Sequence, residues 1–266
     1  MPAPPVDQFV VGGVEIRLYS ICIVAGLLLW IAATARIWER GGGDGVDAAW
    51  LCILSLVPAL AGARVFSVLT DLDTYRGDPR SVLDLGAGGF GIWGAIAGGG
   101  VGLVYGARVR GFPVATFLDC AVPGVALGQA IGRFGNYFNQ ELYGGPTNQP
   151  WALHVDPGFR PPALVDEVTF QPTFLYESLG CLVIFLALGL LWRTSHERFG
   201  PGVTALEYVA LYAVLRFLVE GLRIDPAVEV GGLRINQVVC LFALATAGLI
   251  LTGLRRPPSG RPRPRD

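Results

Sequence analysis

The chain has few charged residues and few reactive side chains. Of its 266 residues only 15% are charged, none is lysine, and only two are histidine. With 52% hydrophobic residues and a mean hydropathy of +0.52, it is more apolar than a soluble domain of this size. A net charge of -1 and the lack of a basic–aromatic patch argue against nucleic-acid binding. We therefore expect an integral membrane protein, and we read the exclusive use of arginine as a coding bias.

Cysteine is also scarce, and its spacing excludes two kinds of site. The five cysteines are odd in number and no apolar segment holds more than one, which indicates neither a disulfide framework nor a metal site. We expect small buried apolar residues at these positions, no metal and no cofactor. The first residues, Met1-Pro2-Ala3-Pro4-Pro5, lack the basic start of a cleavable signal peptide, so the first apolar segment is expected to direct the chain to the membrane.

Apolar segments long enough to span the bilayer recur along the chain. Spanning a hydrocarbon core of about 30 Å takes roughly 20 apolar residues. Seven segments qualify: Tyr19 to Trp38, Ala48 to Leu69, Phe90 to Ala107, Pro113 to Ile131, Thr173 to Trp192, Val203 to Leu222 and Ile235 to Leu254. The sequence therefore predicts an all-α polytopic membrane protein with about seven transmembrane helices.

The distribution of arginine predicts the orientation of these helices. With the N-terminus outside, the inner connections and the tail carry eleven arginines and the outer connections carry seven. The expected organisation is an outer segment 1–18, spans 1–4 within 19–131, a signature loop and small, partly β outer head at 132–171, spans 5–7 within 172–254, and a disordered basic cytoplasmic tail at 255–266.

Polar residues follow the fourth apolar segment directly, in the run Gly132-Arg133-Phe134-Gly135-Asn136-Tyr137-Phe138-Asn139-Gln140-Glu141-Leu142-Tyr143-Gly144. A charged group near bilayer depth costs roughly 2.5 kcal/mol or more, so such residues are functional candidates. A polar loop that caps a helix is the alternative reading. A second set of polar residues, Tyr212, Arg216, Glu220 and Arg223, lies on one helical stripe. This stripe is either an internal ion pair or a binding site for an anionic headgroup.

These segments resemble the prolipoprotein diacylglyceryl transferase family. The first run fills every fixed position of the family pattern Gly-Arg-x-Gly-Asn-(aromatic)-x-Asn-x-Glu-x-x-Gly. The block Gln171-Pro172-Thr173-Phe174-Leu175-Tyr176-Glu177 resembles the Pro-Ser/Thr-x-Leu-Tyr-Glu segment of the family, and the stripe from Tyr212 to Arg223 resembles its penultimate helix. The resemblance covers nearly the whole chain, with the three blocks in the family's order.

The resemblance implies an enzyme of lipoprotein maturation. The family moves the diacylglyceryl group of phosphatidylglycerol to the thiol of the lipobox cysteine in a prolipoprotein signal peptide, which forms a thioether and releases glycerol phosphate. We therefore expect these two substrates, a multi-pass protein of the bacterial cytoplasmic membrane with its N-terminus outside, and a monomer that binds no nucleic acid.

The nucleophile in this reaction belongs to the substrate, so the enzyme must favour a thiolate and stabilise the charge on the departing phosphate. Arg133 and Arg216 are the expected phosphate contacts, because guanidinium binds phosphate oxygens bidentately. Glu141 would orient Arg133 or accept a proton, and Glu220 would fix the rotamer of Arg216. The full candidate set is Arg133, Arg216, Glu141 and Tyr19 for catalysis, and Arg133, Asn136, Asn139, Gly144, Tyr212, Glu220, Arg223, Trp93, Gln171, Tyr176 and Glu177 for substrate binding.

Two positions depart from the family pattern. Trp93, in the run from Gly88 to Ala95, and Gln171 stand where many members carry histidine. The two histidines present, His154 and His196, are expected in the head and in a solvated inner loop, so no imidazole base is available at the family positions. Thiolate formation would then depend on the arginines, on Glu141 or on Tyr19. Tyr19 could instead be an interfacial anchor, and we expect Trp93 to form a wall of the lipid cavity.

Other classes of membrane protein fit the sequence less well. A small-solute transporter usually shows an internal repeat with paired broken helices, and the run at Arg133 has no second copy. A non-catalytic scaffold would not need this set of polar residues on one short segment. An acyltransferase with its own nucleophile is disfavoured, because no cysteine has a histidine nearby in the sequence.

Overall fold

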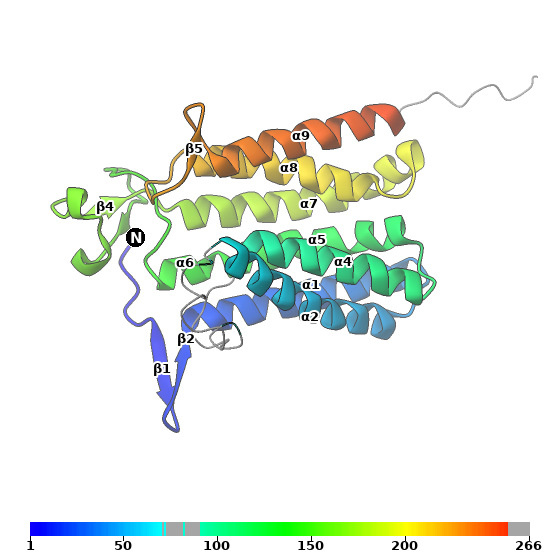
Figure 1. Ribbon diagram of the computed structural model, residues 1–266, viewed down its shortest axis with the longest axis horizontal. Coiled ribbons are helices and arrows are strands. Elements are labelled where there is room, and N and C mark those ends of the chain that lie inside the picture. Colours follow the sequence, from blue (N-terminus) through cyan, green and yellow to red (C-terminus); the bar gives the residue numbers. More distant parts are fainter. Residues whose placement is uncertain (71, 73–81, 83–90, 255–266) are drawn as a thin grey trace, which may run out of the picture. The chain divides into compact units, whose positions relative to one another are not determined.

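The computed structural model describes residues 1–70, 72, 82 and 91–254, and long helices with small two-stranded sheets make up this part of the chain (Figure 1). Six helical segments within it are long and apolar enough to cross a membrane. They are formed by α1 (Leu18–Arg40), α2 (Gly45–Thr70), α4 (Ile92–Val109), α5 (Val114–Gly132) with the short α6 (Phe134–Phe138), α7 (Thr173–Phe199) and α9 (Ile235–Leu254). The expected all-α membrane architecture is confirmed.

The seventh expected segment forms α8 (Val203–Glu220), but its charged residues keep this helix from being counted with the other six. Glu207, Arg216 and Glu220 lie within its 18 residues. Two of these charges neutralise each other, since Arg216 pairs with Glu220 one turn along the helix. The helix is therefore present as predicted, while its polarity sets it apart from the spans around it.

The chain forms two compact units, one of Met1–Trp30 with Val122–Asp266 and the other of Ile31–Ala121. In the second unit, α2 packs on α4 through small residues. A Cβ atom added to Gly94 would lie 2.0 Å from the carbonyl oxygen of Gly62, and one added to Gly98 would lie 2.0 Å from that of Pro58. Glycine is therefore required where these two helix backbones meet, as the glycine run suggested.

In the first unit, glycines likewise allow the backbones of α1 and α5 to approach closely. A Cβ atom on either Gly26 or Gly128 would lie 2.6 Å from the carbonyl oxygen of the other glycine. Ala126, Ile184 and Leu188 form the buried core that joins α5 to α7. This tight packing holds the first turns of α7 and the end of α5 in a fixed relation, which positions the polar residues described below.

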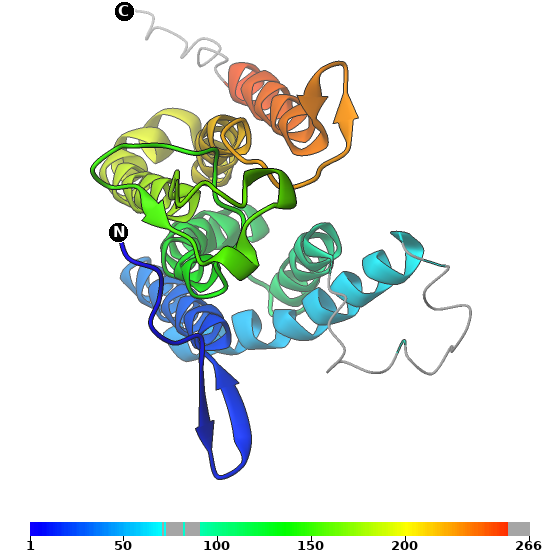
Figure 2. The same ribbon diagram turned by 90° about the vertical axis from the view of Figure 1, so that its left-hand side faces the viewer.

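The segment after α6 forms the small head that the sequence predicted. Strands β3 (Leu153–His154) and β4 (Thr169–Phe170) pair antiparallel, and the 3₁₀ turns η2 (Pro157–Phe159) and η3 (Pro162–Leu164) lie between them. A buried cluster fills the head, with Tyr143, Leu153, Val155, Phe170 and Phe174 as its members. In Figure 2 the green head segment lies across the ends of α5, α7 and α8.

Two β-hairpins precede membrane helices, and the sequence-based reading missed both. Strands β1 (Gln8–Val11) and β2 (Val14–Arg17) lead into α1, and β5 (Glu229–Val230) and β6 (Leu233–Arg234) lead into α9. Both turns are Gly-Gly pairs with positive φ, at Gly12-Gly13 and Gly231-Gly232, the geometry that favours a two-residue hairpin. Both hairpins project from the end of the first unit where the head lies (Figure 1).

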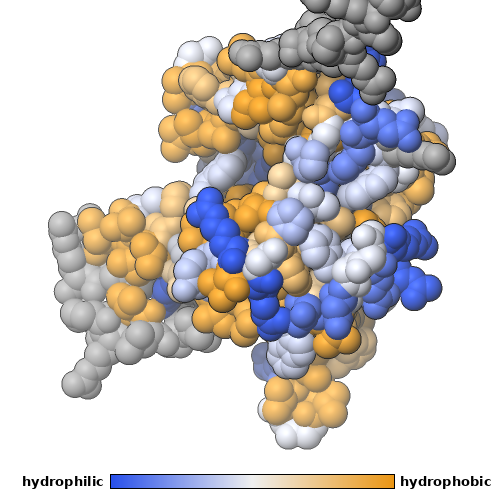
Figure 3. Space-filling view, turned by 90° about the vertical axis from the view of Figure 1, so that its right-hand side faces the viewer, coloured by the Kyte–Doolittle hydropathy of each residue, from blue (hydrophilic) through white to orange (hydrophobic). Residues whose placement is uncertain are grey.

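The first residue of each following helix fixes the base of its hairpin. The backbone N–H of Leu18 donates to the carbonyl of Asp7, and that of Ile235 donates to the carbonyl of Val228, both at 2.8 Å. The apolar side chains of the β1–β2 hairpin are exposed, and they form the orange lobe at the bottom of Figure 3. Segment 1–18 is therefore an ordered arm, whereas the expected disordered tail at 255–266 lies outside the described residues.

Candidate functional site

The signature run is held at the junction of α5 and α6. Arg133 lies between the two helices and Asn136 lies within α6, where its side chain is buried. Gly135 faces the ring of Tyr19, because a Cβ atom at this position would lie 2.8 Å from Cδ2 of the tyrosine. Tyr19 is thus packed directly on the signature helix.

Glu141 is placed by a strained segment of backbone. Its neighbours Gln140 and Leu142 have φ angles of 49° and 59°, in the left-handed region that side chains other than glycine rarely adopt. The Gln140 side chain holds this conformation, since it accepts from the backbone N–H of Asp156 and donates to the Asp156 carboxylate, each at 2.8 Å. Thr173 adds a hydrogen bond to the carbonyl of Leu142.

The carboxylate of Glu141 accepts from amides. Asn136 donates to it at 2.8 Å and Asn139 at 3.2 Å. Arg133 donates to the amide oxygen of Asn136 at 3.4 Å. Glu141 thus reaches Arg133 through the side chain of Asn136, and its expected role in orienting Arg133 or accepting a proton stays a prediction.

Arg133 and Arg216 meet at a single carboxylate, that of Glu177. Arg133 Nη2 lies 2.8 Å from Glu177 Oε1, and Arg216 Nη1 lies 2.8 Å from Glu177 Oε2. The hydroxyl of Tyr212 donates to Glu177 Oε1 at 2.8 Å. The side chain of Glu177 is 3% exposed, so the ion pairs offset the cost of burying its charge. Arginines 83 residues apart in the sequence thus meet at one carboxylate, and their expected contact with a single phosphate stays a prediction.

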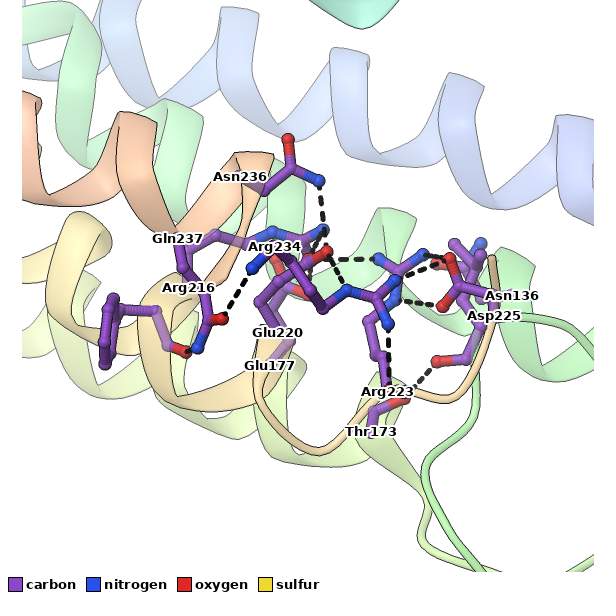
Figure 4. Close-up of polar contacts among 12 residues, drawn as sticks. Asn136, Thr173, Glu177, Arg216, Glu220, Arg223, Asp225, Arg234, Asn236 and Gln237 are labelled. Carbon is purple, nitrogen blue, oxygen red and sulfur yellow. Dashed lines mark hydrogen bonds and ion pairs between the residues drawn. The ribbon is translucent and has the colours of Figure 1, made fainter. Parts of the chain in front are cut away.

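Glu220 is the second shared carboxylate and is completely buried. Its Oε2 lies 2.6 Å from Arg216 Nη2 and 3.7 Å from Arg223 Nη1. Its Oε1 lies 2.9 Å from Arg234 Nε and also accepts from Asn236 at 3.2 Å. Figure 4 shows these side chains converging from α8, β6 and the start of α9. The expected role of Glu220 in holding Arg216 matches this geometry.

Asp225 extends the network beyond the end of α8. Arg223 binds it bidentately, with distances of 2.7 and 2.9 Å, and Arg234 Nη2 lies 3.0 Å from its Oδ2. Burial alone would raise the pKa of Asp225, but the hydrogen bonds and charges of Arg223 and Arg234 outweigh burial and hold that pKa below its usual range. We call the residues Arg133, Arg216, Arg223, Arg234, Glu177, Glu220 and Asp225 the charged network.

Gly144 and Gln171 join the head to the end of α8. The backbone N–H of Gly144 donates to the carbonyl of Gln171 at 2.9 Å, and Gly144 also forms an isolated β-bridge with Arg223. A Cβ atom at Gly144 would lie 2.8 Å from the carbonyl oxygen of Leu222. This close approach gives the signature glycine a packing reason, and its expected contact with substrate stays a prediction.

A small hollow opens beside the charged network. It is lined by Arg133, Asn136, Leu142, Thr173, Phe174, Glu177 and Arg223, and its empty volume is about 180 Å³. Much of this volume is open to solvent, and the enclosed part is about 10 Å³, close to the space that one water molecule needs. Side chains must therefore move before a phospholipid headgroup can enter.

Tyr176 and Trp93 are the remaining candidate residues. Tyr176 accepts a hydrogen bond from Trp151 Nε1 at 2.8 Å, on the head side of α7. Trp93 belongs to the second compact unit and is 40% exposed, so its expected role in the lipid cavity stays a prediction.

Neither histidine lies at the charged network. His154 is on β3, as expected for the head. His196 is not in a solvated loop, because α7 extends to Phe199 and the imidazole stacks on Trp192 with ring centroids 4.4 Å apart. About 28 Å of helix separates His196 from Glu177, at 1.5 Å per residue.

Arg234, Asp225, Asn236 and Gln140 were missed as site residues by sequence reasoning. Arg234 and Asn236 carry the same signal as Arg133, since a charge and an amide adjoin a long apolar segment. Asp225 and Gln140 offer no such signal, because only the folded chain shows which side chains they reach.

Comparison with known proteins agrees with this geometry. The family model described as prolipoprotein diacylglyceryl transferase matches residues 7–252. A phosphatidylglycerol–prolipoprotein diacylglyceryl transferase of Cutibacterium acnes is 39% identical over 96% of this chain and 87% of its own length. Its counterpart in Streptomyces coelicolor is 42% identical, over 97% and 82%, and that of Paenarthrobacter aurescens is 40% identical, over 97% and 85%. The chain belongs to the prolipoprotein diacylglyceryl transferase family.

Proposed function

We propose that this chain transfers the diacylglyceryl group of phosphatidylglycerol to the lipobox cysteine thiol of prolipoproteins. The observation that carries the proposal is the convergence of Arg133 and Arg216 on Glu177, beside the hollow at the end of α7. Two guanidinium groups at one place suit a phosphodiester, whose charge grows as the reaction proceeds.

The reaction needs a thiolate, an aligned carbon and a stabilised leaving group. The thiolate sulfur forms a bond to the glycerol carbon of the diacylglyceryl group, and the bond from that carbon to the phosphate oxygen breaks. The electron pair stays on the departing glycerol phosphate, which gains one negative charge. Arg133 and Arg216 would meet this charge with donors already in place, which supports catalysis without reorganisation at the moment of reaction.

We propose that Glu141 accepts the proton of the substrate cysteine thiol. Glu177 and Glu220 each contact at least two guanidinium groups, so their oxygens are already engaged by cations. Glu141 instead accepts hydrogen bonds from the neutral amides of Asn136 and Asn139. Tyr19, packed on Gly135, would help to fix the segment that carries these groups.

The remaining candidates would shape the binding site. Asn136 and Asn139 would bind the headgroup, and Tyr212 and Glu220 would hold the arginines in place. Gly144, Gln171 and Tyr176 would shape the junction with the head, and Trp93 would pack against lipid. The domain boundaries, the N-outside orientation and the monomeric state expected from the sequence are part of this proposal, and the arginine distribution supports the orientation.

Direct transfer by the purified protein tests the function. The protein is incubated with phosphatidylglycerol and a lipobox peptide, and the mass of the peptide cysteine is measured. We expect a mass gain equal to one diacylglyceryl group, formed as a thioether and absent with Arg133→Ala. An unmodified peptide, with wild-type protein that is folded in detergent, would refute the proposed activity.

A further inference from the structure

The charged network carries a net charge of one positive unit. Four guanidinium groups meet three carboxylates, and each carboxylate contacts at least two of the four. Glu141 stands outside this set, since its hydrogen-bond donors are amides. The net charge of the network thus equals and opposes the single negative charge of a phosphodiester headgroup.

Arg234 contributes one of these positive charges from outside the hollow. It does not line the hollow beside Arg133. Its three nitrogen atoms contact Glu220, Asp225 and the carbonyl oxygen of Arg223 at 2.9 to 3.0 Å. Its side chain is only 12% exposed. Arg234 therefore acts on Arg216 through the carboxylate of Glu220 that the two residues share.

We propose that Arg234 is a positioning residue that balances the charge of Glu220 and Asp225, and that it thereby sets the preference for an anionic over a zwitterionic headgroup. The inference rests on the proposed function. Without Arg234 the network becomes neutral, and Arg216 with the more distant Arg223 must hold a carboxylate whose Oε1 has lost its charged partner. An added phosphate would then be a buried charge without compensation, which is strongly disfavoured.

The chain supplies a matched control for this role. Arg17 is the last residue of β2 and Arg234 is the last residue of β6, and each directly precedes a membrane helix. Arg17 is exposed to solvent, whereas Arg234 reaches two carboxylates. Replacing either arginine removes one positive charge from the same place in a hairpin.

The experiment compares Arg234→Gln, Arg234→Lys, Arg17→Gln and the double variant Arg234→Gln with Asp225→Asn. Transfer is followed in mixed micelles as phosphatidylglycerol content varies, which separates KM from kcat. We expect the apparent KM of Arg234→Gln to rise about tenfold or more, the scale of one lost charge-assisted contact. The apparent KM of Arg234→Lys and of Arg17→Gln should stay within about threefold of the wild-type value. Such a change is well below the loss expected for one charge-assisted contact.

The double variant separates charge balance from a purely structural role. Asp225→Asn removes one negative charge and restores the excess of one, so it should recover most of the loss in KM. If the double variant binds worse than Arg234→Gln alone, Arg234 is only a scaffold and the inference is wrong. An unchanged KM in a folded Arg234→Gln protein would also overturn it.

A binding measurement keeps this inference separate from the proposed function. Thermal stabilisation by phosphatidylglycerol, relative to phosphatidylcholine, is measured for the same variants without peptide. Wild type should be stabilised more by phosphatidylglycerol, and Arg234→Gln should lose this difference. Failure of wild type to modify the peptide would refute the activity, whereas equal lipid preference in wild type and Arg234→Gln would refute only the role of Arg234.

Discussion

The two hairpins that lead into α1 and α9 share one plan but differ in what their last residue reaches. Both turn through a Gly-Gly pair with positive φ, and both are closed by a hydrogen bond from the first residue of the following helix. Arg17 ends the first hairpin in solvent, whereas Arg234 ends the second among Glu220 and Asp225. Similar local sequence thus produces an arm in one place and part of the site in the other.

The largest expected difference concerns one acidic residue at each hairpin, Glu220 in contact with Arg234 and Glu15 on the first hairpin. Glu220→Ala leaves Arg216, Arg223 and Arg234 close together without their shared carboxylate, and breaking a buried ion pair typically costs about 3–5 kcal/mol. We expect a large fall in unfolding temperature and little transfer. Glu15→Ala, on the exposed first hairpin, should change neither. Thermal unfolding in detergent and the transfer assay check both variants, and equal destabilisation by the two would contradict the comparison.

The turns allow a test in which the backbone strain is the same at both sites. Replacing both glycines by alanine forces left-handed φ on two residues, at roughly 1–2 kcal/mol each, and no neighbouring atom lies within 4 Å of any of the four added Cβ positions. At Gly231-Gly232 the strain should displace Arg234 and raise the KM for phosphatidylglycerol. At Gly12-Gly13 it should leave transfer unchanged, and a matching loss there would show that the first hairpin also serves the site.

The smallest expected effect is a dependence on pH. Since the pKa of Asp225 is lowered by Arg223 and Arg234, its contribution to stability is complete above its ordinary pKa of about 4. It is lost as the pH falls through the lowered pKa. The difference in unfolding temperature between wild type and Asp225→Asn should therefore be constant from neutral pH to about pH 5 and shrink in stronger acid. A difference in unfolding temperature that grows in acid would contradict this expectation.

The sequence predicted the helical fold and singled out Arg133 and Arg216 as candidates, because membrane helices and isolated charges give strong local signals. It missed both hairpins, since strands of two to four residues are at or below the shortest length at which alternation can be recognised. The sequence also could not show that Glu177 is the carboxylate shared by the two arginines. That contact depends on how α5, α7 and α8 pack, and packing brings together residues that are remote along the chain.

The backbone around Glu141 has a consequence for the engineering of this protein. Gln140 and Leu142 hold left-handed conformations that glycine would adopt without strain. Glycine at position 142 would release this strain, and it stabilises the protein where the release exceeds the loss of the leucine side chain and the added freedom of the unfolded chain. The same change would loosen the segment that aims the carboxylate of Glu141. Heat resistance and turnover would then be selected in opposite directions at one residue, a conflict common where strain serves an active site.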